Sequence, residues 1–198
     1  IVKTWSDVND AIKLADGTIA LATSRGLVFA DKNFNVVRHY VEEQSDLYAL
    51  NDKSIRAICK DREDNLWVGT VHEGVYIFYK NTAEINYFYP ASKSQKVSQR
   101  LRSIVEDPEG IIWMGSENGG LTRYDPSTGE IKKISLPIKT ENILALKIEG
   151  AYLWVGSYSF TDPLIRLNRK TLSIEAFPDF SRCAYHIEKY AKDTLILS

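Results

Sequence analysis

The chain has 198 residues, and its 25 Lys and Arg nearly balance its 26 Asp and Glu, which leaves a formal net charge of −1. This balance argues against a nucleic-acid-binding domain, which carries a basic face, and against a polybasic module that binds membrane surfaces. Hydrophobic residues make up 44% of the chain, which favours a folded domain over disorder. No run approaches the ~20 apolar residues of a membrane span. Because the sequence begins with Ile1 and not with Met, we interpret it as a piece of a longer protein.

Turn residues divide the chain into short strand-like runs that recur as units of four strands. In the third unit, Asp107-Pro108-Glu109-Gly110 separates the first run from the second, with Pro and Gly where a β-turn favours them. The predicted complete units cover 8–40, 54–89, 101–136 and 142–177. Residues 1–5 are expected to form the outer strand of a preceding unit, and residues 181–198 the first two strands of a following one.

A five-residue core recurs on the second strand of these units. It reads Leu66-Trp67-Val68-Gly69-Thr70, then Ile112-Trp113-Met114-Gly115-Ser116, then Leu153-Trp154-Val155-Gly156-Ser157, and a copy without Trp precedes them at Ile19–Thr23. The Ser or Thr that ends successive copies recurs after 47, 46 and 41 residues. Such a period fits the four-stranded blade of a β-propeller. The sequence therefore predicts an all-β chain that forms an arc of a larger, seven-bladed β-propeller.

The Trp and Gly of the repeated core are expected to be structural. A blade buries its faces only against its neighbours, so a large flat side chain at one repeated position suits the gap between blades. The Gly two residues after the Trp lets a neighbouring segment approach closely. The residues assigned to this role are Trp67, Gly69, Trp113, Gly115, Trp154 and Gly156.

The second and third units resemble the two-component regulator propeller repeat. The resemblance rests on 54–58, 61–70 and 74–78 in the second unit, and on 104–110, 112–116 and 119–129 in the third. The first unit departs from the pattern because Ala20 replaces the Trp, and the fourth because 158–163 replace a Gly-rich turn. The resemblance implies the sensor region of Bacteroidetes hybrid two-component histidine kinase/response regulators, in which propellers precede a membrane span and an intracellular kinase.

The same resemblance implies a function. It implies a non-catalytic, periplasmic sensor segment that detects glycan-derived oligosaccharides, in a full-length parent that forms a homodimer and regulates transcription through a phosphorelay. The remaining blades would belong to the same parent, and this segment is expected to contact neither nucleic acid nor membrane. Two alternatives stay open, namely a protein–protein interaction scaffold of the WD-repeat kind and a secreted carbohydrate-active enzyme built on a propeller.

No residue pattern in the chain predicts catalysis, a cofactor or a metal site. The three histidines, His39, His72 and His186, are scattered without ligand spacing. The acidic residues of the repeats fall at turns, where a carboxylate caps its own backbone. Two cysteines are too few for a disulfide scaffold, and the sequence leaves open whether Cys59 and Cys183 are free or form one disulfide.

Candidate ligand contacts lie where the chain departs from the repeat or faces the propeller axis. The turns between second and third strands supply Arg25, His72, Glu117, Asn118, Tyr158 and Phe160, and the innermost strands supply Arg56 and Arg102. Tyr158 and Phe160 suit stacking on the apolar faces of sugars, and the charged and amide groups suit fixed hydrogen bonds.

Overall fold

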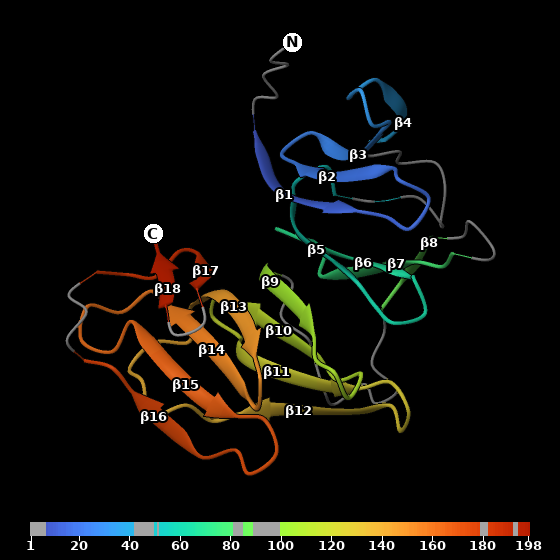
Figure 1. Cartoon of the computed structure of the whole chain (residues 1–198). Helices are drawn as coiled ribbons and strands as arrows, with labels where there is room; N and C mark the ends of the chain where they lie inside the picture. The colour runs from blue at the N-terminus through green and yellow to red at the C-terminus, as the bar shows by residue number, and fades with distance from the viewer. Residues whose placement is uncertain are drawn as a thin grey trace. The chain divides into compact units, whose positions relative to one another are not determined.

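The computed structural model of the chain describes residues 7–41, 50, 52–80, 85–88, 100–178, 182–191 and 194–198. The regular structure of these residues consists of eighteen β-strands, and none of it is helical (Figure 1). This described part of the chain accordingly has no helix that is long and apolar enough to cross a membrane. The predicted all-β class is confirmed, whereas the strand expected at 1–5 lies outside the described residues.

The strands form four antiparallel sheets of four strands and one two-stranded hairpin, in which neighbours along the chain are also neighbours in the sheet. The first sheet contains β1 (Val8–Lys13), β2 (Ile19–Thr23), β3 (Gly26–Ala30) and β4 (Val36–Tyr40). The second contains β5 (Ile55–Lys60), β6 (Leu66–Thr70), β7 (Val75–Phe78) and β8 (Ile85–Tyr87). The third contains β9 (Leu101–Glu106), β10 (Ile112–Ser116), β11 (Gly120–Asp125) and β12 (Glu130–Ile134). The fourth contains β13 (Ile143–Glu149), β14 (Tyr152–Ser157), β15 (Leu164–Asn168) and β16 (Ile174–Ala176), and a hairpin of β17 (Ile187–Ala191) and β18 (Thr194–Leu197) follows it.

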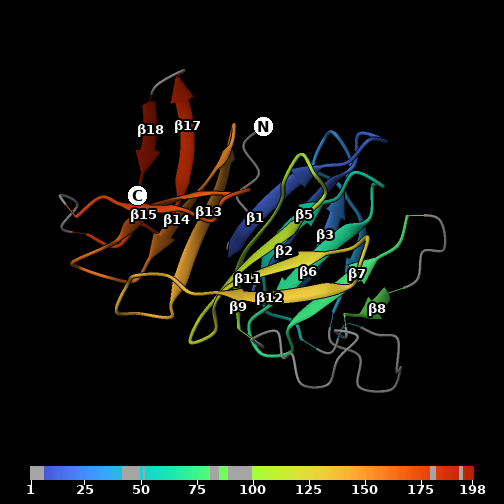
Figure 2. The ribbon, with the colours of Figure 1, turned by 90° about the horizontal axis from the view of Figure 1, so that it is seen from below.

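The sheets belong to two compact units. The first unit contains β1–β8, and the second contains β10–β18 with all of β9 except Leu101. In the first unit, β5 contacts both β1 and β2 of the preceding sheet. In the second, β13 contacts β10 on one side and β17 on the other, and Figure 2 shows the hairpin beside β13. Within each unit, successive sheets thus pack on one another as propeller blades do.

Trp113 belongs to the hydrophobic core of the second unit and is fully buried. Its own sheet supplies Ile111, Leu121 and Ile134 to this core. The next sheet supplies Ile143, Leu146, Leu153, Val155, Ile165 and Leu167. The core therefore lies between two successive sheets, which is the gap that the repeated Trp is predicted to fill.

The glycines of the repeated core lie where a neighbouring segment comes close. A Cβ atom at Gly115 would lie 2.6 Å from Cγ2 of Ile143 and from Oγ of Ser103. A Cβ atom at Gly156 would lie 2.5 Å from the carbonyl oxygen of Ala184. Real Cβ atoms do not approach other atoms so closely, so the sheets reach their observed spacing only with Gly at these positions.

An aspartate at the turn between the first and second strands anchors the Trp in two of the sheets. The Asp107 Oδ2 atom accepts a hydrogen bond of 2.9 Å from the Trp113 indole N–H, and its Oδ1 atom accepts the backbone N–H groups of Glu109 and Ile111. Asp61, six residues before Trp67, accepts the equivalent three hydrogen bonds, from the Trp67 indole and from two backbone N–H groups of its own turn. Each carboxylate is buried, so these bonds supply the partners that a buried charge requires. The turn and the sheet face are thereby fixed to each other.

The first sheet lacks both members of this pair. Leu14 occupies the place of the aspartate, because its N–H bonds the carbonyl of Thr18 just as Asp61 N–H bonds that of Asn65. Ala20 occupies the place of the Trp, and Leu14 and Ala20 belong to the same hydrophobic cluster. The two replacements fit each other, since a buried aspartate without the indole N–H would lose one of its hydrogen-bond donors.

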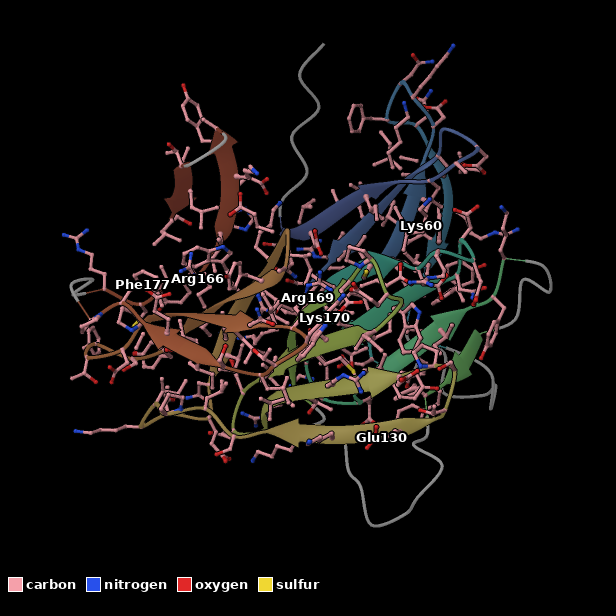
Figure 3. The ribbon with its side chains drawn as sticks, turned by 60° about the horizontal axis from the view of Figure 1, so that its bottom comes forward. Lys60, Glu130, Arg166, Arg169, Lys170 and Phe177 are labelled. Carbon is pink, nitrogen blue, oxygen red and sulfur yellow. The ribbon has the colours of Figure 1, made fainter. Side chains whose placement is uncertain are left out.

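In the second unit, Arg169 of the fourth sheet forms an ion pair with Asp107 of the third sheet and so connects the two sheets. It lies in the turn between β15 and β16, next to Lys170 (Figure 3). Its Nη1 atom is 3.1 Å from Oδ2 of Asp107 in the preceding sheet. Its guanidinium also pairs with Glu109 and donates a 2.7 Å hydrogen bond to the carbonyl of Gly150. The Arg169 side chain is only 6% exposed and that of Asp107 only 2%, so this is a buried ion pair between two sheets.

We expect Trp113→Ala to lower the free energy of unfolding by about 3–5 kcal/mol, because it removes a fully buried aromatic side chain and leaves a cavity. The matched control is Trp154→Ala, which removes a partly exposed Trp from the same repeat position and should cost less. Urea unfolding followed by far-UV circular dichroism measures both. Equal losses would contradict the packing described for Trp113.

We expect Arg169→Met to lower the free energy of unfolding by about 3–5 kcal/mol, because it leaves the buried Asp107 carboxylate without its cation. Lys170→Met is the control, since it removes the same charge from a largely exposed side chain of the same turn. That control should cost less than about 1 kcal/mol in the same urea experiment. An Arg169→Met protein as stable as the parent would contradict the stabilising role of the buried ion pair between Arg169 and Asp107.

Candidate functional site

Two of the predicted ligand contacts, Tyr158 and Phe160, come together with a third aromatic side chain, Tyr185. The rings of Tyr158 and Phe160 meet edge to face with their centroids 6.0 Å apart, and those of Tyr158 and Tyr185 with centroids 6.4 Å apart. The three residues are 46%, 67% and 55% exposed. We call Tyr158, Phe160 and Tyr185 the aromatic platform. Large apolar groups that remain this accessible, and that gather in one place, suit a binding surface better than a core.

The loop that presents Tyr158 and Phe160 is held by its own polar groups. The Ser157 N–H bonds the carbonyl of Pro163 at 2.8 Å, and the Ser157 hydroxyl donates to the carbonyl of Asp162 at 2.9 Å. Ser159, which is buried, accepts the Asp162 N–H on its Oγ atom at 3.1 Å. Because Ser159 is turned inward and bonded, its neighbours Tyr158 and Phe160 are turned outward.

Tyr185 reaches the platform from the segment that leads into β17. Its N–H donates a 2.7 Å hydrogen bond to the carbonyl of Ser198 at the end of β18, and the preceding Cys183 and Ala184 are buried. Sequence reasoning missed Tyr185, because its segment belongs to an incomplete unit without a full set of matching positions. The signal available in the sequence was a tyrosine that directly follows the apolar pair Cys183-Ala184.

The aromatic platform borders a cleft of about 1240 Å³ in the second unit. The apolar wall of the cleft is formed by Trp154, Leu164, Phe177, Leu195 and Leu197. The guanidinium of Arg166 lies over the rings of Tyr152, Trp154 and Phe177, at 4.5, 5.4 and 5.8 Å from their centroids. Figure 3 shows Arg166 and Phe177 next to each other.

The apolar interior of this cleft corresponds to the sheet surface that another sheet covers around Trp113. Trp154 occupies the repeat position of Trp113, and Trp113 is covered by residues from three strands of the next sheet. Beyond its own sheet, Trp154 shares a hydrophobic cluster with the two-stranded hairpin, through Ile187, Leu195 and Leu197. We therefore read the depth of the cleft as a sheet-packing surface and the aromatic platform at its border as the candidate ligand site.

Three further candidates in the second unit are paired within the chain. Arg102 Nε lies 2.8 Å from Glu117 Oε1, so these two predicted contacts neutralise each other. Asn118 donates its N–H to Oδ1 of Asn142 at 2.7 Å, and the carbonyl of Asn142 accepts the Tyr158 N–H at 2.9 Å. Asn142, which sequence reasoning did not single out, thus connects the turn at Asn118 with the platform loop.

The candidates in the first unit lie at separate places. Arg56 donates from Nη1 to Oδ1 of Asn9 at 3.1 Å, and both residues lie where the pairing of first and second strands shifts by one residue, as at a β-bulge. His72 Nδ1 is 3.3 Å from the buried Asp52 carboxylate, which also accepts the His72 N–H. The Arg25 side chain is 80% exposed, with Asp7 3.9 Å away.

The described residues contain no cluster of three or more His, Cys, Asp or Glu side chains that could hold a metal ion. Neither Cys59 nor Cys183 forms a disulfide in the described part of the chain. The turn aspartates Asp61 and Asp107 bind backbone groups, and neither of them lines the cleft beside the aromatic platform. The side chains at the site supply aromatic surface and charged groups.

The turn between β5 and β6 carries Asp64, a carboxylate whose pKa is lowered by two lysines. Lys60 and Lys80 both donate to Asp64, with Nζ to carboxylate oxygen distances of 2.6 and 2.5 Å, and these bonds lower the pKa of Asp64 from 3.8 to about 2. Because the pKa of Asp64 is lower in the folded protein than in the unfolded chain, the ionised Asp64 stabilises the fold at pH values above the unfolded pKa. This contribution is lost as the pH falls toward 2.

We expect a carboxyl NMR titration to place the pKa of Asp64 near 2. Lys80→Met should raise it toward the ordinary value, because one of the two donated hydrogen bonds is removed. Lys132→Met, which removes an exposed lysine of the other unit, is the control and should leave it unchanged. An Asp64 pKa that stays near 2 in the Lys80→Met protein would contradict the hydrogen bond between Lys80 and Asp64.

Comparison with known proteins agrees with this architecture. A family model described as "two component regulator propeller" matches residues 49–72 and 96–118. No curated protein matches the chain. The extracellular domain of a hybrid two component system of B. thetaiotaomicron superposes with a TM-score of 0.81 at 17% identity, over 98% of this chain and 26% of that one. The extracellular domain of a one component system of the same organism gives 0.78 at 15% identity, with the same coverage.

An enzyme shares the fold as well. Virginiamycin B lyase of Staphylococcus aureus superposes with a TM-score of 0.71 at 16% identity, over 96% of this chain and 62% of that one. The chain spans about a quarter of the length of the B. thetaiotaomicron domains and under two thirds of the lyase. At such identities the likeness shows the fold, which is a β-propeller of four-stranded antiparallel blades. Residues 49–72 and 96–118 are thus similar to two-component regulator propeller repeats.

Proposed function

We propose that this chain is a non-catalytic, extracytoplasmic sensor segment of a hybrid two-component system, and that it binds a glycan-derived oligosaccharide on the aromatic platform. The observation that carries the proposal is the exposed, internally braced cluster of Tyr158, Phe160 and Tyr185. The regulator propeller repeats and the likeness to extracellular domains of two component systems support the sensor role.

The chemistry of the platform suits a sugar. A pyranose ring has an apolar C–H face, which packs on an aromatic ring, and hydroxyl groups at its rim, which stay in water or bond polar neighbours. The hydrogen bonds of Ser157 and Ser159 hold the loop before any ligand arrives, so little conformational entropy is lost on binding. A sensor requires a difference in affinity between two states and no turnover, which agrees with a site of contacts and charges.

The remaining parts of the proposal concern the full-length protein. We place this segment in the periplasm, with the remaining blades of its propeller in the same parent chain. The parent would be a histidine kinase that acts as a homodimer, because a two-fold pair is the commonest closed symmetry and brings two kinase domains together. Transcription regulation through a phosphorelay would follow from ligand binding in this region.

Isothermal titration calorimetry of the folded protein, against neutral and acidic oligosaccharides from plant and host glycans, tests the proposal. We expect at least one fragment to bind without being cleaved, and Tyr158→Ala and Tyr185→Ala each to weaken it by about tenfold, because each removes a stacking surface. Tyr190→Ala is the matched control, since Tyr190 is 75% exposed on β17 and does not line the cleft.

Three outcomes would count against parts of this proposal. Cleavage of a fragment would favour a propeller enzyme. The absence of binding to every fragment, with circular dichroism showing folded protein, would remove the oligosaccharide function. Binding that survives both platform substitutions would keep the sensor role and move the site elsewhere.

A further inference from the structure

The ionic side chains that line the cleft beside the aromatic platform are Glu149, Arg166 and Arg182. Glu149 is committed to partners: its Oε1 atom is 2.5 Å from Lys189 Nζ, and its Oε2 atom accepts the Trp154 indole N–H at 3.3 Å. These bonds lower the pKa of Glu149, the hydrogen bond from Lys189 most of all, so the carboxylate stays ionised and neutralised by its lysine.

Arg166 is committed as well. Its Nη2 atom donates to Oε2 of Glu175 at 2.5 Å, and its guanidinium lies over the rings of Tyr152 and Trp154. The carboxylate of Glu175 offsets the charge of Arg166, and the cation–π contacts hold its guanidinium in place. Neither Glu149 nor Arg166 therefore offers a free charge to a ligand.

Arg182 differs from both of them. It is exposed, and no hydrogen bond or ion pair joins it to any other residue that the structure describes. It lies three residues before Tyr185 of the aromatic platform, and the two residues between them, Cys183 and Ala184, are buried. This segment therefore presents one cation and one aromatic ring to the same cleft, anchored by the pair between them.

We propose that the ligand of the aromatic platform is an acidic oligosaccharide, with a carboxylate or sulfate on the sugar, and that Arg182 determines this specificity. The inference rests on the proposed function, because it names the class of sugar that the same site takes. A guanidinium offers paired N–H donors that match the oxygens of a carboxylate or sulfate, while the rings contact the sugar face. A positive charge without a partner at a partly apolar cleft also attracts anions from solution.

The experiment compares ligands that differ only in charge. Calorimetry measures binding of trigalacturonate against its neutral trimethyl ester, and of a sulfated carrageenan disaccharide against the desulfated sugar. We expect one of the two acidic ligands to bind at least about tenfold more tightly than its neutral partner, and this preference to shrink as NaCl rises from 50 to 500 mM. The pair that shows the preference distinguishes a carboxylate from a sulfate.

Substitutions then assign the preference to a residue. Arg182→Met should lower the affinity for the acidic ligand about tenfold and leave the neutral one unchanged, and Arg182→Lys should restore part of the loss, because it keeps the charge but not the paired donors. Lys170→Met is the control, since it removes one positive charge from an exposed side chain outside the cleft.

The outcomes separate this inference from the proposed function. Equal binding of acidic and neutral partners, binding of neutral sugars alone, or a preference that survives Arg182→Met would overturn the role of Arg182 and leave the oligosaccharide sensor standing. No binding by any sugar, acidic or neutral, would overturn the proposed function and this inference together.

Discussion

The hydrogen bond between a turn aspartate and a Trp on the next strand is the constraint on which the second and third sheets depend. One buried carboxylate takes two backbone N–H groups of its own turn and the indole N–H of a side chain six residues later. The turn thereby fixes the rotamer of the Trp, and the Trp fills the space between sheets. Arg169 extends the same network into the next sheet of the second unit, so that turn geometry, core packing and the spacing of sheets become one cooperative arrangement.

This constraint acts at one end of the second and third sheets and leaves the other end free to vary. In an antiparallel sheet, the turn between first and second strands and the turn between second and third strands lie at opposite ends of the second strand. The aspartate network occupies the former, and the platform loop at 157–163 is the latter in the fourth sheet. A rigid sheet that keeps its core therefore tolerates a new loop at the opposite end, which is how propellers of one fold come to bind different ligands.

The repeated Trp and Gly were sufficient to predict the fold, because a period of about four strands recurs in the printed sequence whether or not any contact is known. Tyr158 and Phe160 stand out in the sequence because they break that period. The pairing of Arg102 with Glu117, the bridge at Asn142 and the contribution of Tyr185 could not be predicted, since they depend on which residues of separate strands come side by side. The replacement of the Trp by Ala20 is evident from the sequence. The replacement of the aspartate by Leu14 is recognised only from the hydrogen bond of its turn.

The fourth sheet departs from the repeat at both ends, and it is the sheet that carries most of the candidate site. Its first turn is shorter, so that Glu149, five residues before Trp154, replaces the aspartate six residues before, and the indole bond lengthens to 3.3 Å. Glu149 is shared with Lys189 of the hairpin, which makes the anchor of Trp154 depend on a neighbouring element. The second loop of the sheet has exchanged a glycine turn for the serine-braced aromatic loop. Local departures from the consistent pattern of a repeat are expected where a protein has been selected for something other than stability, and here they converge on the cleft beside Tyr158, Phe160 and Tyr185.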